Sequence, residues 1–364
     1  MLLLSLFLVV VLLNTFFYVI FSKFTFSKPK NPTTQPSFPV SLIICAKNEA
    51  ENLKKNIPLW LSQDYPEFEL ILINDSSTDD TQEIIESFAT EHPQVHTVNI
   101  DNNEAFWSNK KYSLTLGIKR AVHQRLIFTD ADCEPASNNW LRLMANQISE
   151  EKQLVLGYGA YRKKPGFLNM LIRYETFITA VQYFSFAMNG MPYMGVGRNL
   201  AYTAKLFYDN RGFMSHMEVN SGDDDLFVNE VATKQNVSLC YHPDAFTYSE
   251  PKQSFKDWYH QKRRHISTAK FYKPNHKTFL ALYYFSNLLF WILTAVSFFF
   301  VDWKIPLTLI IFRILLQYAL LGNATKLLKE QSLKPWIPFL ELFLVSFQLI
   351  IFISNTFSKP KRWK

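Results

Sequence analysis

Long apolar stretches at both ends of this 364-residue chain constrain its fold more than any other feature. Hydrophobic residues make up 48% of the chain and aromatic residues 16%, which is too apolar for a purely soluble domain. A helix needs about 20 mostly apolar residues to cross a bilayer, and three stretches reach that length. A fourth, 305–321, is shorter and contains Arg313. The sequence therefore predicts membrane segments on both sides of a soluble middle, at residues 2–21, 279–301, 305–321 and 336–357.

The basic residues beside these stretches predict their orientation. Lys23, Lys28 and Lys30 follow the first stretch, so the positive-inside tendency leaves the N-terminus outside and the middle of the chain in the cytosol. A cleavable signal peptide would need a basic start, a shorter apolar core and a small-residue cleavage site, and none is present. We therefore expect an uncleaved anchor.

The C-terminal stretches leave a conflict. Three crossings there would place Lys359, Lys361, Arg362 and Lys364 outside, against the same tendency. One stretch would then be re-entrant or interfacial, and the sequence does not decide which.

The net charge of +7 and the cysteines indicate the surroundings of the chain. Basic residues gather beside the apolar segments, which favours anionic lipid headgroups as partner over nucleic acid. Cys45, Cys133 and Cys240 are scattered and show no metal-ligand spacing. We therefore expect a reduced, cytosolic middle domain without a disulfide framework.

The middle of the chain alternates short β-branched runs with helical patterns, which predicts an α/β domain with a mostly parallel sheet. Pro29, Pro32, Pro36 and Pro39 indicate a stiff linker before it. Strands are expected at 40–45, 68–74, 95–100, 125–129 and 154–157, and helices at 49–62, 78–90, 110–123 and 138–148. The predicted organisation is an anchor at 1–22, a linker at 23–39, a cytosolic domain at 40–275, membrane segments at 276–358 and a basic tail at 359–364.

Residues 167–188 depart from this alternation. They are rich in Phe, Tyr, Leu and Ile, but Arg173 and Glu175 make the segment a poor membrane span. An interfacial helix and an ordinary buried helix both fit this composition.

The strongest chemical signal is Thr129-Asp130-Ala131-Asp132 after an apolar run. In an extended segment, residues two apart point to the same side, so Asp130 and Asp132 can converge at the end of a strand. Two hard carboxylates suit Mg²⁺ or Mn²⁺, with phosphate oxygens and water at the remaining positions. Such pairs are also common in solvated turns, so the motif depends on its neighbours.

Two other predicted strands end in polar groups at the same edge of the sheet. Residues 71–75 end in Asp75, which is placed to accept hydrogen bonds from a nucleotide, and residues 41–45 lead into Ala46-Lys47-Asn48-Glu49. In open α/β sheets, ligands bind at this carboxyl edge. Helix capping is the simpler interpretation for Ser77 or Thr78.

Three adjacent carboxylates follow in Gly222-Asp223-Asp224-Asp225. Such crowding raises at least one pKa unless a cation or hydrogen-bond donors offset it. A helix N-terminus would favour the charges and is the structural alternative to a general base. Further on, Gln261 and Arg264 are three residues apart on one helical face and could both reach a diphosphate.

Taken in order, these motifs resemble the family 2 glycosyltransferases with the GT-A fold over residues 40–270. The metal motif matches Asp130 and Asp132, and Asn109-Lys110 with Leu114 and Gly117 resembles the Gly-Lys segment. Gly195-Val196-Gly197-Arg198-Asn199 resembles the stretch that faces the acceptor. Gln261 to His265 resembles a Gln-x-x-Arg-Trp motif with His265 in place of Trp.

The resemblance implies a role for each matching residue. Asp224 is the implied catalytic base, and Asp223 is the alternative if the register slips by one residue. The implied donor-nucleotide site contains Ala46, Asn48, Glu49, Asp75, Lys110 and Asp130, and the implied metal ligands for Mg²⁺ or Mn²⁺ are Asp130 and Asp132. The implied acceptor and diphosphate site contains Gly197, Asn199, Asp225, Gln261, Arg263 and Arg264.

The reaction that the resemblance implies is inverting transfer from a nucleotide-diphosphate sugar, with a UDP-sugar favoured, to a lipid-linked or polysaccharide acceptor. It places the protein in a bacterial inner membrane with a cytosolic catalytic domain. A processive polysaccharide synthase and a polyprenyl-phosphate sugar synthase are the alternatives within the class. A non-catalytic scaffold of the same fold would be expected to lack a metal carboxylate or the base.

Overall fold

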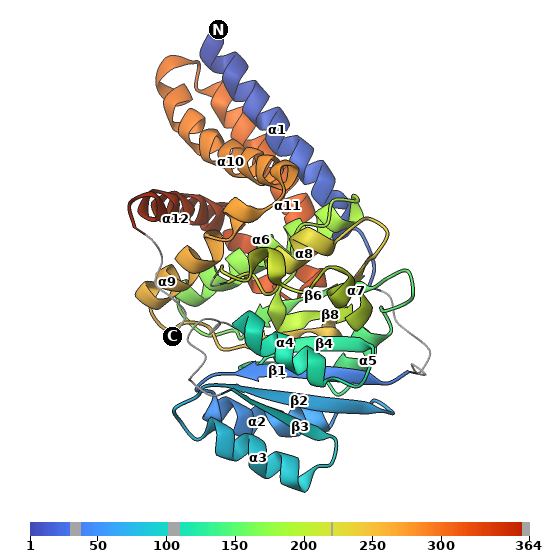
Figure 1. Ribbon diagram of the computed structural model, residues 1–364. Helices are drawn as coiled ribbons and strands as arrows, with labels where there is room; N and C mark the ends of the chain where they lie inside the picture. Colours follow the sequence, from blue (N-terminus) through green and yellow to red (C-terminus); the bar gives the residue numbers. More distant parts are fainter. Residues whose placement is uncertain (30–37, 101–109, 220, 359–364) are drawn as a thin grey trace. The chain divides into compact units, whose positions relative to one another are not determined.

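A computed structural model describes residues 1–29, 38–100, 110–219 and 221–358 (Figure 1). The chain divides into two compact units: unit 1 comprises residues 1–28, 163–191 and 252–361, and unit 2 comprises 29–162, 192–251 and 362–364. Several residues used above lie outside the described ones: Lys30, Pro32, Pro36, Asn109 and the basic tail at 359–364.

Unit 2 is built on a seven-stranded sheet in the order β3-β2-β1-β4-β8-β6-β9. Strands β1 to β4 are mutually parallel where they pair, and β8 is antiparallel to both β4 and β6. The β-branched runs found in the sequence form β1 (Val40–Ala46), β2 (Phe68–Asp75), β3 (Val95–Ile100), β4 (Arg125–Asp130) and β6 (Leu154–Gly157), of which all but β3 are mostly buried. The mostly parallel sheet expected from the sequence is therefore confirmed.

The order of these strands creates a switch point. The chain runs outward from β1 through β2 to β3 and then returns to place β4 on the other side of β1. Crossover helices α2 (Ala50–Leu61), α3 (Thr81–Glu91) and α4 (Lys110–Arg120) connect these strands. In α/β proteins, ligands bind at such a switch point, at the carboxyl ends of the strands.

Five short strands were not expected from the sequence. They are β5 (Cys133–Pro135), β7 (Gly159–Tyr161), β8 (Leu200–Thr203), β9 (Val237–Cys240) and β10 (Thr247–Ser249). A second sheet has the order β5-β10-β7, so β10 holds the segment after the metal motif against residues 159–161. The helix expected at 138–148 is shorter, as α5 (Trp140–Ala145). Unit 2 also contains α7 (Ala204–Asp209) and α8 (Asp225–Val231).

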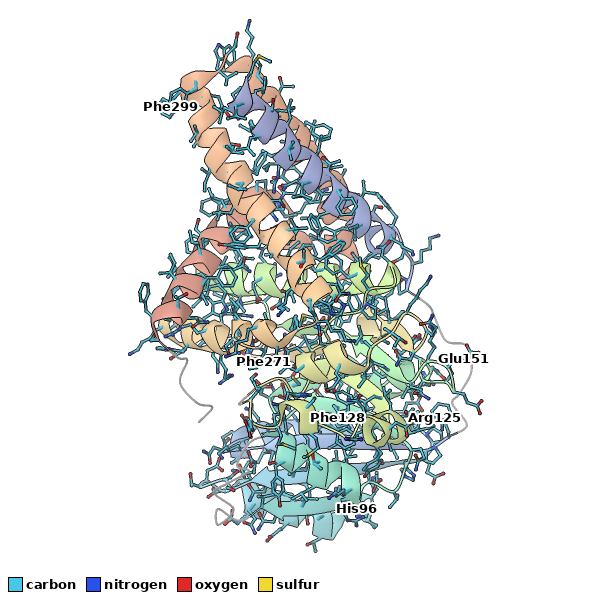
Figure 2. The ribbon with its side chains drawn as sticks, turned by 45° about the horizontal axis from the view of Figure 1, so that its top comes forward. His96, Arg125, Phe128, Glu151, Phe271 and Phe299 are labelled. Carbon is cyan, nitrogen blue, oxygen red and sulfur yellow. The ribbon has the colours of Figure 1, made fainter. Side chains whose placement is uncertain are left out.

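Unit 1 contains the long apolar helices. The described chain has four helices long and apolar enough to cross a membrane: α1 (Leu2–Thr25), α10 (Pro274–Phe300), α11 (Lys304–Leu327) and the 331–357 segment, a 3₁₀ turn at Gln331–Trp336 followed by α12 (Ile337–Phe357). Helix α1 packs along both α10 and α11. Phe7, Val10 and Val11 form a buried cluster with Phe290 and Leu293 there. Figure 2 shows Phe299 at the far end of α10.

Two helices expected within the 40–275 domain belong to unit 1 instead. They are α6 (Phe167–Met188) and α9 (Phe255–Ile266). Helix α6 is mostly buried, and its Arg173 pairs with Glu330 while its Glu175 pairs with Lys262 at 2.5 Å. The buried-helix interpretation of residues 167–188 therefore fits, because partners within the unit neutralise its charges.

Candidate active site

The candidate site lies in unit 2 at the carboxyl ends of β1, β2 and β4. Parallel register aligns Cys45 with Asp130 and Ala46 with Asn74, so the ends of the three strands meet at one edge. Asp75 ends β2 and is buried, accepting a hydrogen bond from Ser113 Oγ at 2.9 Å. Lys47 Nζ lies 3.9 Å from its other oxygen. The sheet thus brings Ala46, Asp75 and Asp130 together as the sequence predicted.

The loops after β1 and β2 are tied to each other. Asn48 has a positive φ of 56°, and its side-chain oxygen accepts hydrogen bonds from the backbone N–H and the hydroxyl of Thr78. The Glu49 N–H donates to Thr81 Oγ1 at 2.9 Å. Ser76, at the start of the second loop, also has a positive φ, of 54°. Strained backbone of this kind clusters at functional sites and persists only where surrounding contacts hold it.

Asp130, Asp132 and Cys133 form the group in the described chain that is suited to hold a metal ion, with ligand atoms within 4.8 Å of one another. Burial raises the pKa of Asp132, and the neighbouring Asp130 carboxylate adds to the rise, while Arg198 opposes it. Burial also raises the pKa of the Cys133 thiol, whose Sγ lies 3.0 Å from Ser249 Oγ. Because a protonated thiol is a poor ligand, the donor set is two hard carboxylates, which fits Mg²⁺ or Mn²⁺.

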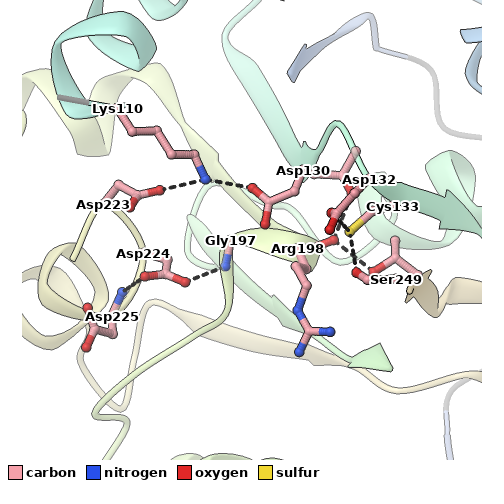
Figure 3. Close-up of polar contacts among 12 residues, drawn as sticks. Lys110, Asp130, Asp132, Cys133, Gly197, Arg198, Asp223, Asp224, Asp225 and Ser249 are labelled. Carbon is pink, nitrogen blue, oxygen red and sulfur yellow. Dashed lines mark hydrogen bonds and ion pairs between the residues drawn. The ribbon is translucent and has the colours of Figure 1, made fainter. Parts of the chain in front are cut away.

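Lys110 connects this pair to the second acidic cluster (Figure 3). Its ammonium lies 2.6 Å from Asp130 Oδ1 and 3.1 Å from Asp223 Oδ2. Burial alone would lower the pKa of Lys110, but the two carboxylates raise it well above its usual value. Burial would likewise raise the pKa of Asp223, but Lys110 holds it below its usual value. Lys110 therefore neutralises one carboxylate of each cluster.

Asp224 is held by backbone amides. Its Oδ2 accepts from the Gly197 N–H at 2.7 Å, and its Oδ1 accepts from the Asp225 N–H at 2.7 Å. The second contact caps α8, so the capping interpretation is correct in part. Burial raises the pKa of Asp224 to about 7, and Asp223 and Asp225 contribute to the rise. A carboxylate poised near neutrality in this way suits proton transfer.

Gly222 gives the acidic cluster its backbone conformation. Its φ is 96°, and a Cβ there would lie 2.5 Å from side-chain atoms of Leu226. Only glycine adopts such a turn readily, and the turn leads directly into Asp223. Asp225 begins α8, is buried, and accepts a hydrogen bond from the Leu226 N–H at 2.8 Å.

Asn199 has a different position from the one expected. It is fully buried, its amide N–H₂ donates to the carbonyl oxygens of Tyr158 and Ala245, and its oxygen accepts from Trp140 Nε1. A side chain whose donors and acceptor are all used inside the core supports the 197–199 turn and does not face an acceptor. Gly197, at the start of the turn, contacts Asp224.

Two cations of the site were given no role of their own from the sequence, although Arg198 belongs to the stretch Gly195 to Asn199. Arg198 lies 4.3 Å from the centre of the Tyr161 ring and donates to the Ala160 carbonyl at 3.2 Å. Lys111 is buried and donates to the carbonyls of His216, Val219 and Ser221 at 2.9, 2.5 and 2.7 Å. Lys110 and Lys111 are neighbours in α4, but Lys110 contacts carboxylates and Lys111 contacts backbone carbonyls. The sequence indicated Lys111 only as a second basic residue beside Lys110.

Gln261, Arg263 and Arg264 are on α9 and belong to unit 1. Arg263 is engaged there with the end of α12, where its Nε donates to Asn355 Oδ1 at 2.7 Å and its guanidinium also contacts Ser354 and Ser358. These contacts differ from the diphosphate-binding role expected for Arg263. They follow from its place on the buried side of α9.

In open α/β sheets, the switch point at the carboxyl ends of the strands is where nucleotides and other ligands bind, and the carboxylate pair lies at that point. The family model described as "Glycosyl transferase family 2" matches residues 41–205, and the model described as "Glycosyl transferase family group 2" matches residues 127–351, more than half of the chain. The chain belongs to the family 2 glycosyltransferases.

Relatives of known name share only part of their length with this chain. A 4,4'-diaponeurosporenoate glycosyltransferase of Staphylococcus haemolyticus is 36% identical over 128 residues, which are 35% of this chain and 32% of that protein. A poly-beta-1,6-N-acetyl-D-glucosamine synthase of Staphylococcus epidermidis is 36% identical over 93 residues, 26% of this chain and 21% of that protein. The matched segment thus spans a third or less of these relatives.

The fold is similar to that of a solved mannosyltransferase. PcManGT from Pyrobaculum calidifontis, in complex with GDP-Man and Mn²⁺, superposes with a TM-score of 0.59 at 17% identity, covering 93% of this chain and 99% of that one. At that identity the likeness shows the fold, which is the GT-A fold expected from the sequence.

Proposed function

We propose that this protein is a metal-dependent, inverting glycosyltransferase that moves a sugar from a nucleotide-diphosphate donor to a hydroxyl of a lipid-linked or glycan acceptor at a membrane. The observation that carries the proposal is the pair of acidic clusters joined by Lys110 at the switch point of the sheet. One cluster is suited to a cation, and the other contains a carboxylate with a pKa of about 7.

Donor binding is assigned to the ends of β1, β2 and β4. The nucleoside would lie against Asp75 and the tied loops at Asn48 and Glu49, with the diphosphate beside Asp130 and Asp132. Mg²⁺ or Mn²⁺ held by Asp130 and Asp132 would neutralise charge on the leaving diphosphate. Lys110 supplies a second positive charge at the same place. Electrostatic stabilisation of this kind is often the largest contribution to catalysis.

Asp224 is assigned as the general base. Its carboxylate takes the proton of the acceptor hydroxyl, whose oxygen forms the new bond to the anomeric carbon while the bond to the diphosphate breaks. Gly197 and Asp225 N–H groups orient the carboxylate through both oxygens. Lys110 keeps Asp223 ionised, so Asp223 does not compete for the same proton. The geometry therefore favours Asp224 over Asp223 as the base.

The acceptor is assigned by class. One relative is named for glycosyl transfer to 4,4'-diaponeurosporenoate and another for synthesis of a poly-N-acetylglucosamine, so both lipid and glycan acceptors occur among similar proteins. The four long apolar helices favour a membrane-borne acceptor for this chain. A UDP-sugar is our first choice of donor, and a bacterial inner membrane with a cytosolic site is the proposed location.

The proposal is tested with the full chain reconstituted in lipid and supplied with UDP-, GDP- and dTDP-sugars in turn. We expect nucleotide diphosphate release from one donor class, dependent on Mg²⁺ or Mn²⁺, and faster when a lipid extract or glycan primer is added. The Asp224→Asn variant is the matched control for contaminating hydrolases. Equal release by the variant and the wild type would refute the assignment.

A further inference from the structure

Helix α12 crosses the helices α10 and α11 instead of running along them. Tyr284 of α10 contacts α12 at two positions seven residues apart: its hydroxyl donates to the Val345 carbonyl at 3.3 Å, and its ring lies 5.0 Å from Phe352. From α11, Arg313 and Gln317 both reach a single residue of α12, Glu341, at 2.7 and 3.0 Å. Both views show α12 running across the direction of α10 (Figures 1 and 2).

Helix α12 instead runs beside α9. The contacts between these two helices advance in the same direction along both chains, as expected for two helices that lie side by side. The contacting pairs are Phe255 with Phe343, Trp258 with Phe347, Tyr259 with Ser354, and Arg263 with Asn355. In the second pair the rings are stacked 4.3 Å apart with an interplanar angle of 2°.

The composition of α9 excludes it from the bilayer interior. Its 12 residues include five ionised side chains, namely Lys256, Asp257, Lys262, Arg263 and Arg264. Charged side chains are costly at the centre of a membrane-spanning helix. We therefore expect α9 to lie outside the hydrocarbon core of the bilayer. Because α12 is held along α9, it shares that depth.

The face of α12 that points away from these contacts is apolar and exposed. Its members are 3, 7, 1, 3 and 4 residues apart, and at about 100° per residue they fall within about 100° of the helix circumference, on one side of α12. They are Phe339, Leu342, Leu349, Ile350, Ile353 and Phe357. Trp336, which is 51% exposed, precedes the helix, and tryptophan is enriched at the membrane–water interface.

We propose that α12 lies in the plane of the membrane, in the cytosolic leaflet, with its exposed apolar face in contact with lipid. Its length and composition suit a crossing, but its contacts with α9, α10 and α11 do not. The partner of this face is the bilayer itself. Only α1, α10 and α11 then cross, and the conflict with the positive-inside tendency disappears.

The proposal is tested by labelling single cysteines introduced into the full chain in intact cells. The three positions are exposed: Asp302→Cys between α10 and α11, Lys326→Cys at the end of α11, and Thr356→Cys at the end of α12. An in-plane helix leaves residues 326 and 356 on the cytosolic side of the membrane. An impermeant maleimide should therefore label the cysteine at residue 302 in intact cells and leave those at residues 326 and 356 unlabelled. Labelling of residue 356 together with residue 302 would overturn the proposal. The native chain is the background control, since Cys45, Cys133 and Cys240 are buried.

Depth measurements give a second readout, independent of transferase activity. Spin labels are placed one at a time at Phe339, Ser346 and Ile353, which are exposed on the same face. Residues 339 and 353 would differ in depth by about 21 Å in an upright helix, from a rise of about 1.5 Å per residue. We expect depths that agree within about one helical turn, roughly 5 Å. A depth that changes steadily from residue 339 to residue 353, with a total difference close to that of an upright helix, would refute the in-plane assignment.

Discussion

The two acidic clusters of unit 2 contain the same residue type in different surroundings. Asp130 and Asp132 contact side chains, the Lys110 ammonium and the Cys133 thiol, which are attached to the backbone through rotatable bonds. Asp224 contacts backbone N–H groups of Gly197 and Asp225, which cannot move without the loops that carry them. The comparison teaches that a carboxylate held by mobile partners suits a ligand site, whereas one held by backbone suits a proton acceptor of fixed position.

The largest effect is expected at the first cluster. Removing the divalent cation with a chelator, or replacing Asp132 by Asn, should abolish transfer, because a metal supplies several kcal/mol of charge stabilisation to the leaving group. Mn²⁺ or Mg²⁺ should restore activity to the chelated wild type but not to Asp132→Asn. Glu134→Gln, which changes a nearby carboxylate paired with Lys55 and Arg162, is the control. Full turnover in chelator would contradict the metal assignment.

Replacing the base in the second cluster should lower the rate of transfer without weakening donor binding. Asp224→Asn should lower kcat by roughly 10²–10⁴-fold, the usual contribution of a positioned base, with the donor Kd nearly unchanged. Steady-state kinetics and donor titration separate the two quantities. The neighbours Asp223→Asn and Asp225→Asn serve as register controls. If Asp223→Asn removed turnover while Asp224→Asn kept near-normal kcat, the base would be Asp223.

The pH profile distinguishes the clusters further. A base acts in its ionised form, so kcat should rise with pH through about 7, the pKa of Asp224, and level off above it. Well below that pKa, kcat should fall about tenfold for each pH unit. Replacing Gly197 by Pro removes an N–H that favours the ionised form, so it should move the midpoint upward. A flat profile between pH 5 and 8 would argue against a carboxylate base with this pKa.

The smallest effect is expected at Lys111, which supports the loop before the second cluster. Lys111→Met leaves three carbonyls without their charged donor, and we expect about 1–3 kcal/mol less unfolding free energy. Because this loop leads to Asp224, kcat should fall more than donor affinity. Chemical denaturation and kinetics measure the two effects. Lys119→Met, on the same helix but exposed, should change neither.

Much of the fold was predictable because its signals are local. The strands β1, β2, β4 and β6 are mostly buried runs rich in β-branched and aliphatic residues, and β3 is buried only at its two ends. The observed bounds of these five strands differ from the expected ones by one residue or less. Strands β8, β9 and β10 have three or four residues and pair with distant segments. No local pattern distinguishes such segments from loops.

The site was predictable where it follows from strand ends. Asp75 and Asp130 end buried strands, so parallel pairing alone brings them to one edge. Asn199 and Lys111 show the limit of that reasoning, because the residues around each of them in the sequence do not indicate the distant groups that each one contacts. Asn199 is buried because Tyr158, Ala245 and Trp140, from three segments distant in sequence, form hydrogen bonds with its side-chain amide. The Lys111 ammonium donates to backbone carbonyls that are more than a hundred residues away in the sequence.

The sequence by itself determined the α/β class, the apolar helices, the metal motif and the acidic triplet, because each depends on residues close together in the chain. Only the tertiary structure decided how these parts act. It set the bridging position of Lys110, the neutral-range pKa of Asp224 and the membership of α6 and α9 in unit 1. The reason is physical. Hydrophobic periodicity depends on residues that are close together in the sequence, whereas burial, charge pairing and hydrogen bonding depend on which distant segments the folded chain brings into contact.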